Sequence, residues 1–81
     1  MVNHSEERGL YLIEAGAFHL PQASKWQPRL TMTRLRSRTG LPKSQAFPGL
    51  RPLFDTAKGA TAFATDLGRS MADLGSPRLT V

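Results

Sequence analysis

Residues 55–77, DTAKGATAFATDLGRSMADLGSP, decide the fold because they carry the signals of a capped amphipathic helix. Asp55 or Thr56 can cap its start by accepting hydrogen bonds from backbone N–H groups, and Gly75 followed by Pro77 is a typical stop. Between these ends, small and apolar residues form one stripe, consisting of Ala57, Ala60, Phe63, Ala64, Leu67, Met71 and Leu74. Such a stripe must be covered, so we predict that this helix packs against a sheet.

Alternating segments upstream of the helix predict that sheet. Residues 10–18 and 26–36 each alternate apolar and polar side chains with the two-residue period of a strand. A weaker third strand lies within residues 45–54, where prolines and a glycine interrupt the pattern. Pro28 has no N–H to give to a ladder, so we expect it at a strand entrance or on an edge. The turn-rich residues 37–44 join the second and third strands, with a projecting β-arm as the alternative.

The order of these elements predicts an α+β fold. We expect a small antiparallel sheet of three strands, with a fourth as the alternative, and one C-terminal amphipathic helix packed on one face. The chain of 81 residues has room for one small domain. We place this domain at residues 10–75, between a flexible N-terminus at 1–9 and a C-terminal tail at 76–81. An open sheet edge, or a helix–helix seam built on the apolar stripe, would make the chain a homodimer.

Composition excludes several classes of function. The chain has no cysteine, which removes disulfide frameworks, thiolate zinc sites and cysteine nucleophiles. Neither His4 nor His19 has a metal-ligand spacing, and the few acids do not suggest a catalytic pair. We therefore predict that the chain is not an enzyme and has no catalytic or metal-binding residues, no cofactor and no small-molecule substrate. Glu6 and Glu7 do not fit a signal peptide, and the absence of a long apolar run predicts a cytoplasmic chain with no membrane partner.

Positive charge is concentrated in the middle of the chain. The formal net charge is +5, yet residues 25–54 contain no acid at all. The cations of this segment are Lys25, Arg29, Arg34, Arg36, Arg38, Lys43 and Arg51. Uncompensated cations attract polyanions, and a guanidinium pairs with phosphate more specifically than an ammonium does. A basic domain without any anionic partner is the alternative interpretation.

The basic segment predicts binding of single-stranded nucleic acid with weak sequence preference. Guanidinium groups neutralise phosphates while aromatic rings stack on unpaired bases, and either a basic sheet face or the β-arm can carry both. The residues expected to contact phosphates are Arg29, Arg34, Arg36 and Arg38, with Lys43 and Arg51 secondary, and Trp26 is the expected stacking ring. The alternative function is a protein-interaction or homodimerisation module with no role in nucleic-acid binding.

Short motifs in the second strand and the helix carry a resemblance to known proteins. They consist of Trp26 and Pro28, followed by Phe54, Thr56, Ala60, Ala64 and Gly68. Over residues 10–74 the chain resembles an uncharacterised family of small proteobacterial proteins of β-β-β-α type, which implies a bacterial protein. In outline it is similar to the Whirly-type regulators, which bind single-stranded DNA and dimerise through helices. Those regulators have four strands, one more than we predict here.

Overall fold

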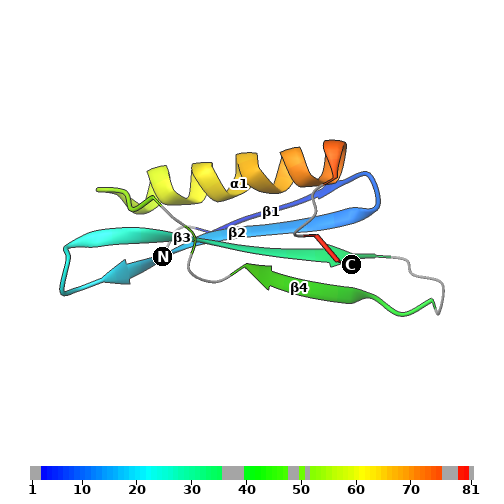
Figure 1. The fold of residues 1–81 in the computed structure, drawn as a ribbon, viewed down its shortest axis with the longest axis horizontal. Coiled ribbons are helices and arrows are strands. Elements are labelled where there is room, and N and C mark those ends of the chain that lie inside the picture. Colours follow the sequence, from blue (N-terminus) through cyan, green and yellow to red (C-terminus); the bar gives the residue numbers. More distant parts are fainter. Residues whose placement is uncertain (1–2, 36–39, 48–49, 51, 76–78, 81) are drawn as a thin grey trace.

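The computed structural model describes residues 3–35, 40–47, 50, 52–75 and 79–80. Within these residues a four-stranded antiparallel sheet carries one C-terminal helix on one face (Figure 1). The elements are β1 (Asn3–Arg8), β2 (Tyr11–Leu20), β3 (Lys25–Arg34), β4 (Lys43–Phe47) and α1 (Ala57–Leu74). The strands lie in the sheet in chain order, β1-β2-β3-β4. The predicted α+β fold class is confirmed, and the sheet has the fourth strand that we gave as the alternative.

β2 and β3 are the long central strands, and their alternation defines the two faces of the sheet. Ile13 and Met32 oppose each other across the two strands and are completely buried beneath the helix. The opposite phase contains Glu14 and Arg29, which are both exposed. We call the side that α1 packs on the covered face and the other side the uncovered face (Figure 1). The two strand phases predicted from the sequence are confirmed.

Pro28 lies inside β3, at a point where one side of the strand is left without a ladder. The β4 ladder stops at Leu30, two residues further along. On the same side, Trp26 and Phe54 exchange two backbone hydrogen bonds of 2.7 and 2.9 Å. Backbone groups of alternate residues point the same way, so the missing N–H of Pro28 falls between that bridge and the ladder. Proline therefore takes the predicted edge position and not the strand entrance.

β1 occupies a segment that the sequence predicts to be flexible, residues 1–9. It pairs antiparallel with β2 along all six of its residues. Two of its side chains toward the helix, Glu6 and Arg8, are charged and meet charges of α1 instead of the apolar core. Arg8 donates to both carboxylate oxygens of Asp73, and Arg69 donates to Glu6. A strand held in this way has no hydrophobic alternation, which is why the sequence pattern missed it.

α1 begins and ends at the predicted caps. The Thr56 hydroxyl accepts a hydrogen bond from the N–H of Gly59 at 3.0 Å. At the other end Gly75 has φ 75°, and its N–H donates to the carbonyl of Met71 at 2.9 Å. A positive φ of this size favours glycine, so Gly75 ends the helix where the sequence predicts.

The helix lies close to the sheet because it presents a glycine at the contact. A Cβ at Gly68 would lie 2.6 Å from Ile13 Cγ2 and 3.0 Å from Leu30 Cδ1, so no larger residue fits there without a shift. The buried helix residues are Ala60, Thr61, Ala64, Thr65, Gly68 and Met71. Because the buried face includes Thr61 and Thr65, it is rotated around the helix relative to the predicted stripe. Leu74 lies outside this face and is 84% exposed. The predicted stripe is therefore wrong at its C-terminal end.

The core is completed from the β4 side and by the end of the chain. Phe47 and Leu50 are buried in the same cluster as the β2, β3 and α1 residues. Leu79 packs against this cluster, and the N–H of Thr80 donates to Gln45 Oε1 at 2.7 Å. In the described part of the chain, no helix combines the length and the apolar character that crossing a membrane requires.

Candidate nucleic-acid interface

The predicted contact residues do not share one surface of the sheet. Arg29 lies on the uncovered face. The register places the other described members in the phase of the covered face: Trp26, Arg34 and Lys43. The remaining predicted contacts lie outside the described residues: Arg36, Arg38 and Arg51.

Trp26 lies at the opposite end of β3 from Arg34 and on the opposite face from Arg29. Its ring is half-buried and packs against His19, with the ring centroids 4.8 Å apart. Because successive strand residues point to opposite faces, a separation of three residues places Trp26 and Arg29 on different sides. The predicted stacking ring therefore cannot join a surface built around Arg29.

An aromatic ring that the sequence analysis did not select lies beside Arg29. Phe18 of β2 is 42% exposed, and the guanidinium carbon of Arg29 lies 4.7 Å from the centroid of its ring. A cation over an aromatic face is attracted by the ring quadrupole, so the two side chains support each other. The signal was present in the sequence: the alternation of residues 10–18 places Phe18 in the same phase as Glu14, away from Ile13.

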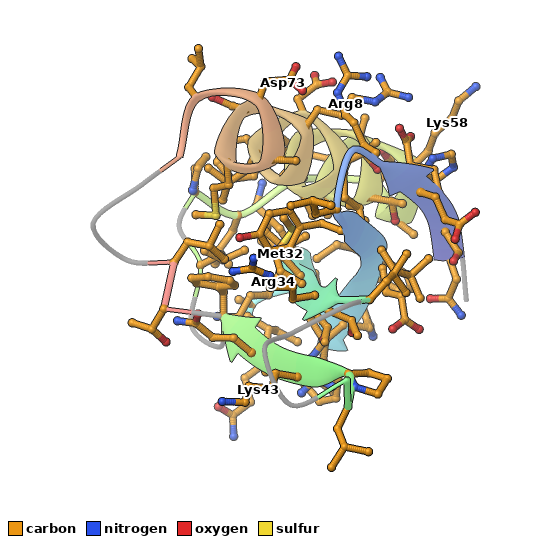
Figure 2. The ribbon with its side chains drawn as sticks, turned by 90° about the vertical axis from the view of Figure 1, so that its right-hand side faces the viewer. Arg8, Met32, Arg34, Lys43, Lys58 and Asp73 are labelled. Atoms are coloured by element: carbon orange, nitrogen blue, oxygen red, sulfur yellow. The ribbon has the colours of Figure 1, made fainter. Side chains whose placement is uncertain are left out.

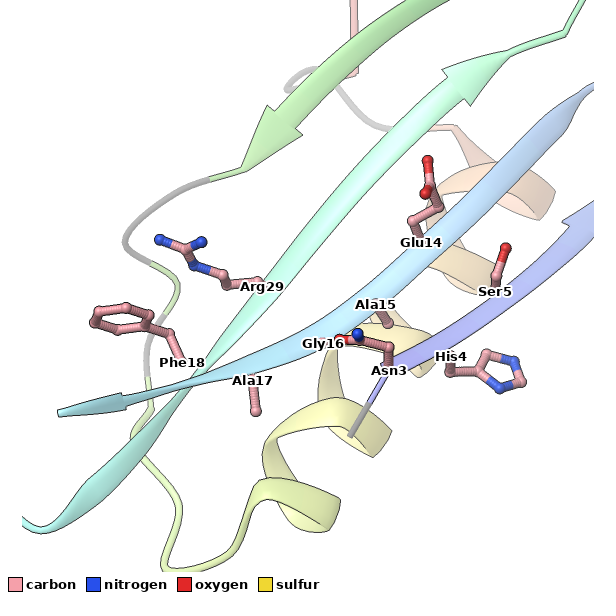
Figure 3. Close-up of a pocket in the computed structure, with 9 residues that line it drawn as sticks. All are labelled: Asn3, His4, Ser5, Glu14, Ala15, Gly16, Ala17, Phe18 and Arg29. Atoms are coloured by element: carbon pink, nitrogen blue, oxygen red, sulfur yellow. The ribbon is translucent and has the colours of Figure 1, made fainter. Parts of the chain in front are cut away.

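Phe18 and Arg29 border a depression of about 310 Å³ on the uncovered face (Figure 3). Its lining residues on this face are Asn3, Ser5, Glu14, Gly16, Phe18 and Arg29. Figure 3 shows Phe18 and Arg29 directed away from the helix, whereas Ala17 points toward it. The depression brings together a ring, a guanidinium, a carboxylate and small polar groups around a glycine.

A second group of cations forms a row across one end of the sheet. The register pairs Arg8 with Tyr11, Tyr11 with Arg34, and Arg34 with Lys43, from β1 to β4. Figure 2 views this end and labels its three cations. Arg8 is neutralised by Asp73, with both N–O distances at 2.8 Å. No carboxylate of the described residues forms an ion pair with Lys43.

Ion pairs occupy other cations of the chain. Lys25, the first cation of the basic segment, pairs with Asp55, and this contact lowers the pKa of the Asp55 carboxyl. Hydrogen bonds from Arg69 and His4 lower the pKa of Glu6 from 4.5 to about 2. Cations that are already paired add little to the attraction of a polyanion. Of the described cations, Lys43 at this end of the sheet, Arg29 and Lys58 form no ion pair with a described carboxylate.

The residues described by the structure contain no group of three His, Asp or Glu side chains that could hold a metal ion. No protein-family model, no curated protein and no solved structure matches the chain. The resemblances to a proteobacterial family and to Whirly-type regulators therefore stay predictions.

Proposed function

We propose that the chain binds nucleic acid, with weak sequence preference, through the end of the sheet at which β3 and β4 are joined. The observation that carries the proposal is the direct opposition of Arg34 and Lys43 across these strands. A phosphate between two opposing cations can accept charge-assisted hydrogen bonds from both of them. Contacts of this kind do not depend on the identity of the bases.

The composition of the connecting segment supports the same end of the sheet. The chain between Arg34 and Lys43 contains Arg36 and Arg38, which lie outside the described residues, and it contains no acid. By contrast, Glu14 lines the same depression of the uncovered face as Arg29. Of the two predicted interfaces, the sheet end is therefore the one whose connecting sequence is free of acid.

Charge reversal at the described pair tests the proposal. In the double variant Arg34→Glu/Lys43→Glu, we expect binding to a labelled oligonucleotide at about 50 mM salt to be lost, because phosphate contacts dominate the affinity. The thermal unfolding transition should remain, since neither side chain belongs to the buried core cluster.

The matched control is Lys25→Glu/Lys58→Glu, which changes the net charge by the same amount at exposed or half-buried positions elsewhere. This control should still bind. Retained binding by Arg34→Glu/Lys43→Glu, or an equal loss in both double variants, would contradict the proposal.

A second candidate function, a protein-interaction module, is favoured by three exposed leucines at the same end of the molecule. Leu10, Leu41 and Leu74 are 55%, 67% and 84% exposed. A homodimer formed by these side chains would sediment as a monomer after Leu41→Ser/Leu74→Ser. The helix–helix seam considered from the sequence would need Ala64 and Met71, which are buried against the sheet in this fold.

A further inference from the structure

We propose that the depression beside Phe18 and Arg29 takes one base of a single-stranded nucleic acid, so that the chain prefers unpaired strands to duplexes. This inference rests on the proposed function, because the affinity for phosphate comes from the end of the sheet. It adds a second contact, on the uncovered face, that only an unpaired base can make. The row of cations contacts phosphates, which single strands and duplexes both carry, so it does not distinguish the two.

The Phe18–Arg29 pair supplies the stacking surface. The ring of Phe18 is 42% exposed and the Arg29 guanidinium carbon lies 4.7 Å from its centroid. Unpaired bases stack on aromatic rings and on guanidinium groups, and such stacking tolerates any base. The N–H donors of the same guanidinium can pair with the phosphate that follows the stacked base.

The size and the lining of the depression suit one small group. Gly16 lies opposite Arg29 in the register and contributes no side chain to the lining, while its own backbone is buried. The depression of about 310 Å³ is at the lower end of the range for small-ligand pockets. A second hollow of about 200 Å³ lies against Arg29 from the side of Thr31 and Ala46. Arg29 thus stands between two hollows, as a stacking group between neighbouring bases would.

Glu14 gives the site a base preference. A carboxylate repels phosphate, but it accepts hydrogen bonds from the exocyclic amino group of cytosine. Thymine presents a carbonyl oxygen at the corresponding position, which would face the carboxylate as a second acceptor. Because Glu14 lines the same depression as Phe18, we expect a stacked cytosine to bind better than a stacked thymine.

The positions of the two contacts explain why a duplex would not reach both of them. Arg29 and Arg34 belong to one strand, five residues and about 17 Å apart, on opposite faces of the sheet. A nucleic acid that touches both must pass around the end of the sheet. A single strand is flexible enough for this path, whereas a duplex resists bending and keeps its bases stacked inside.

Fluorescence anisotropy with labelled oligonucleotides tests the base site. The probes are oligodeoxycytidine and oligodeoxythymidine of twelve nucleotides and a mixed-sequence duplex of twelve base pairs. Phe18→Ala should weaken binding to both single strands by roughly tenfold and leave duplex binding unchanged. Leu53→Ala is the control, because Leu53 is apolar and equally exposed at 42% but does not line the depression.

Two further outcomes complete the test. The wild type should bind oligodeoxycytidine several-fold more tightly than oligodeoxythymidine, and Glu14→Gln should reduce this ratio. If Phe18→Ala changes no affinity, or weakens single strands and duplex equally, the base site is overturned while the charge-based interface stands. If the wild type binds none of the three probes, the base site and the proposed function are both overturned.

Discussion

The covered and uncovered faces of this sheet are built from alternate residues of the same two strands, yet they tolerate change very differently. On the covered face, Ile13 and Met32 are completely buried and a single added carbon at Gly68 would clash. On the uncovered face, Phe18 and Arg29 are exposed and border a depression. The residues that hold the fold are buried, whereas the residues of the proposed binding sites lie outside the buried core cluster. Substitutions at Ile13, Met32 or Gly68 should therefore change stability, whereas substitutions at Phe18 or Arg29 should change binding.

The largest expected effect comes from overfilling the contact between helix and sheet. In Gly68→Leu, the new side chain would begin 2.6 Å from Ile13 Cγ2, so α1 must move away from the sheet. We expect a loss of about 3 kcal/mol or more, which is a large fraction of the stability of a domain of this size.

Circular dichroism with thermal unfolding measures this loss. Ala62→Leu, on the exposed side of the same helix, is the control and should melt close to the wild type. A Gly68→Leu variant as stable as this control would show that the close approach of α1 does not hold the domain together.

Met32 and Thr31 are neighbours in β3 that point to opposite faces of the sheet. Met32→Ala removes a completely buried side chain and should cost about 2–5 kcal/mol. Thr31→Ala changes a half-buried residue on the other face and should stay within about 0.5 kcal/mol. Urea unfolding of both variants gives the two values. Equal losses of unfolding free energy in the two variants would mean that the uncovered face contributes as much to stability as the covered face.

A smaller effect on stability is expected at the ion pairs between β1 and α1, where the covered face ends. The pKa of Glu6 is about 2 in the folded chain, below its ordinary value of 4.5, because of hydrogen bonds from Arg69 and His4. The ionised carboxylate therefore stabilises the fold above pH 4.5, and this contribution is lost as the pH falls toward 2. Urea unfolding at several acidic pH values measures the loss.

The control for this pH dependence is Glu6→Gln, which keeps the shape of the side chain but cannot ionise. Its stability should fall less steeply between pH 4.5 and 2 than that of the wild type. Equal slopes for the two proteins would show that this ion pair does not anchor β1.

The sequence predicted those parts of the fold whose signals are local. Helix caps depend on near neighbours, and the predicted caps Thr56 and Gly75 are confirmed. Strand alternation is also local, and the predicted inward positions of Ile13 and Leu30 are confirmed. β1 was missed because its inner residues are charged and find partners in the helix only after folding. β4 begins at Lys43, before the predicted range of 45–54. The prediction missed this start because its polar residues carry no hydrophobic period.

The candidate interface was less predictable because it depends on register. No local pattern places Arg8, Arg34 and Lys43 in one row, since that alignment follows from how three separate strands pair. The sequence favours Trp26 as the stacking ring because this ring is interleaved with the cations of the basic segment. The exposed ring next to Arg29 is instead Phe18, which the sequence places in an acidic segment on the preceding strand.

Amide chemical-shift mapping during titration with an unlabelled single-stranded oligonucleotide tests the separation of the two faces most directly. The account predicts that shifts concentrate at Phe18 and Arg29 on the uncovered face and at Arg34 and Lys43 on the sheet end. The outer surface of α1, represented by Lys58, should not respond. Shifts centred on α1, with the uncovered face and the sheet end unchanged, would contradict the account.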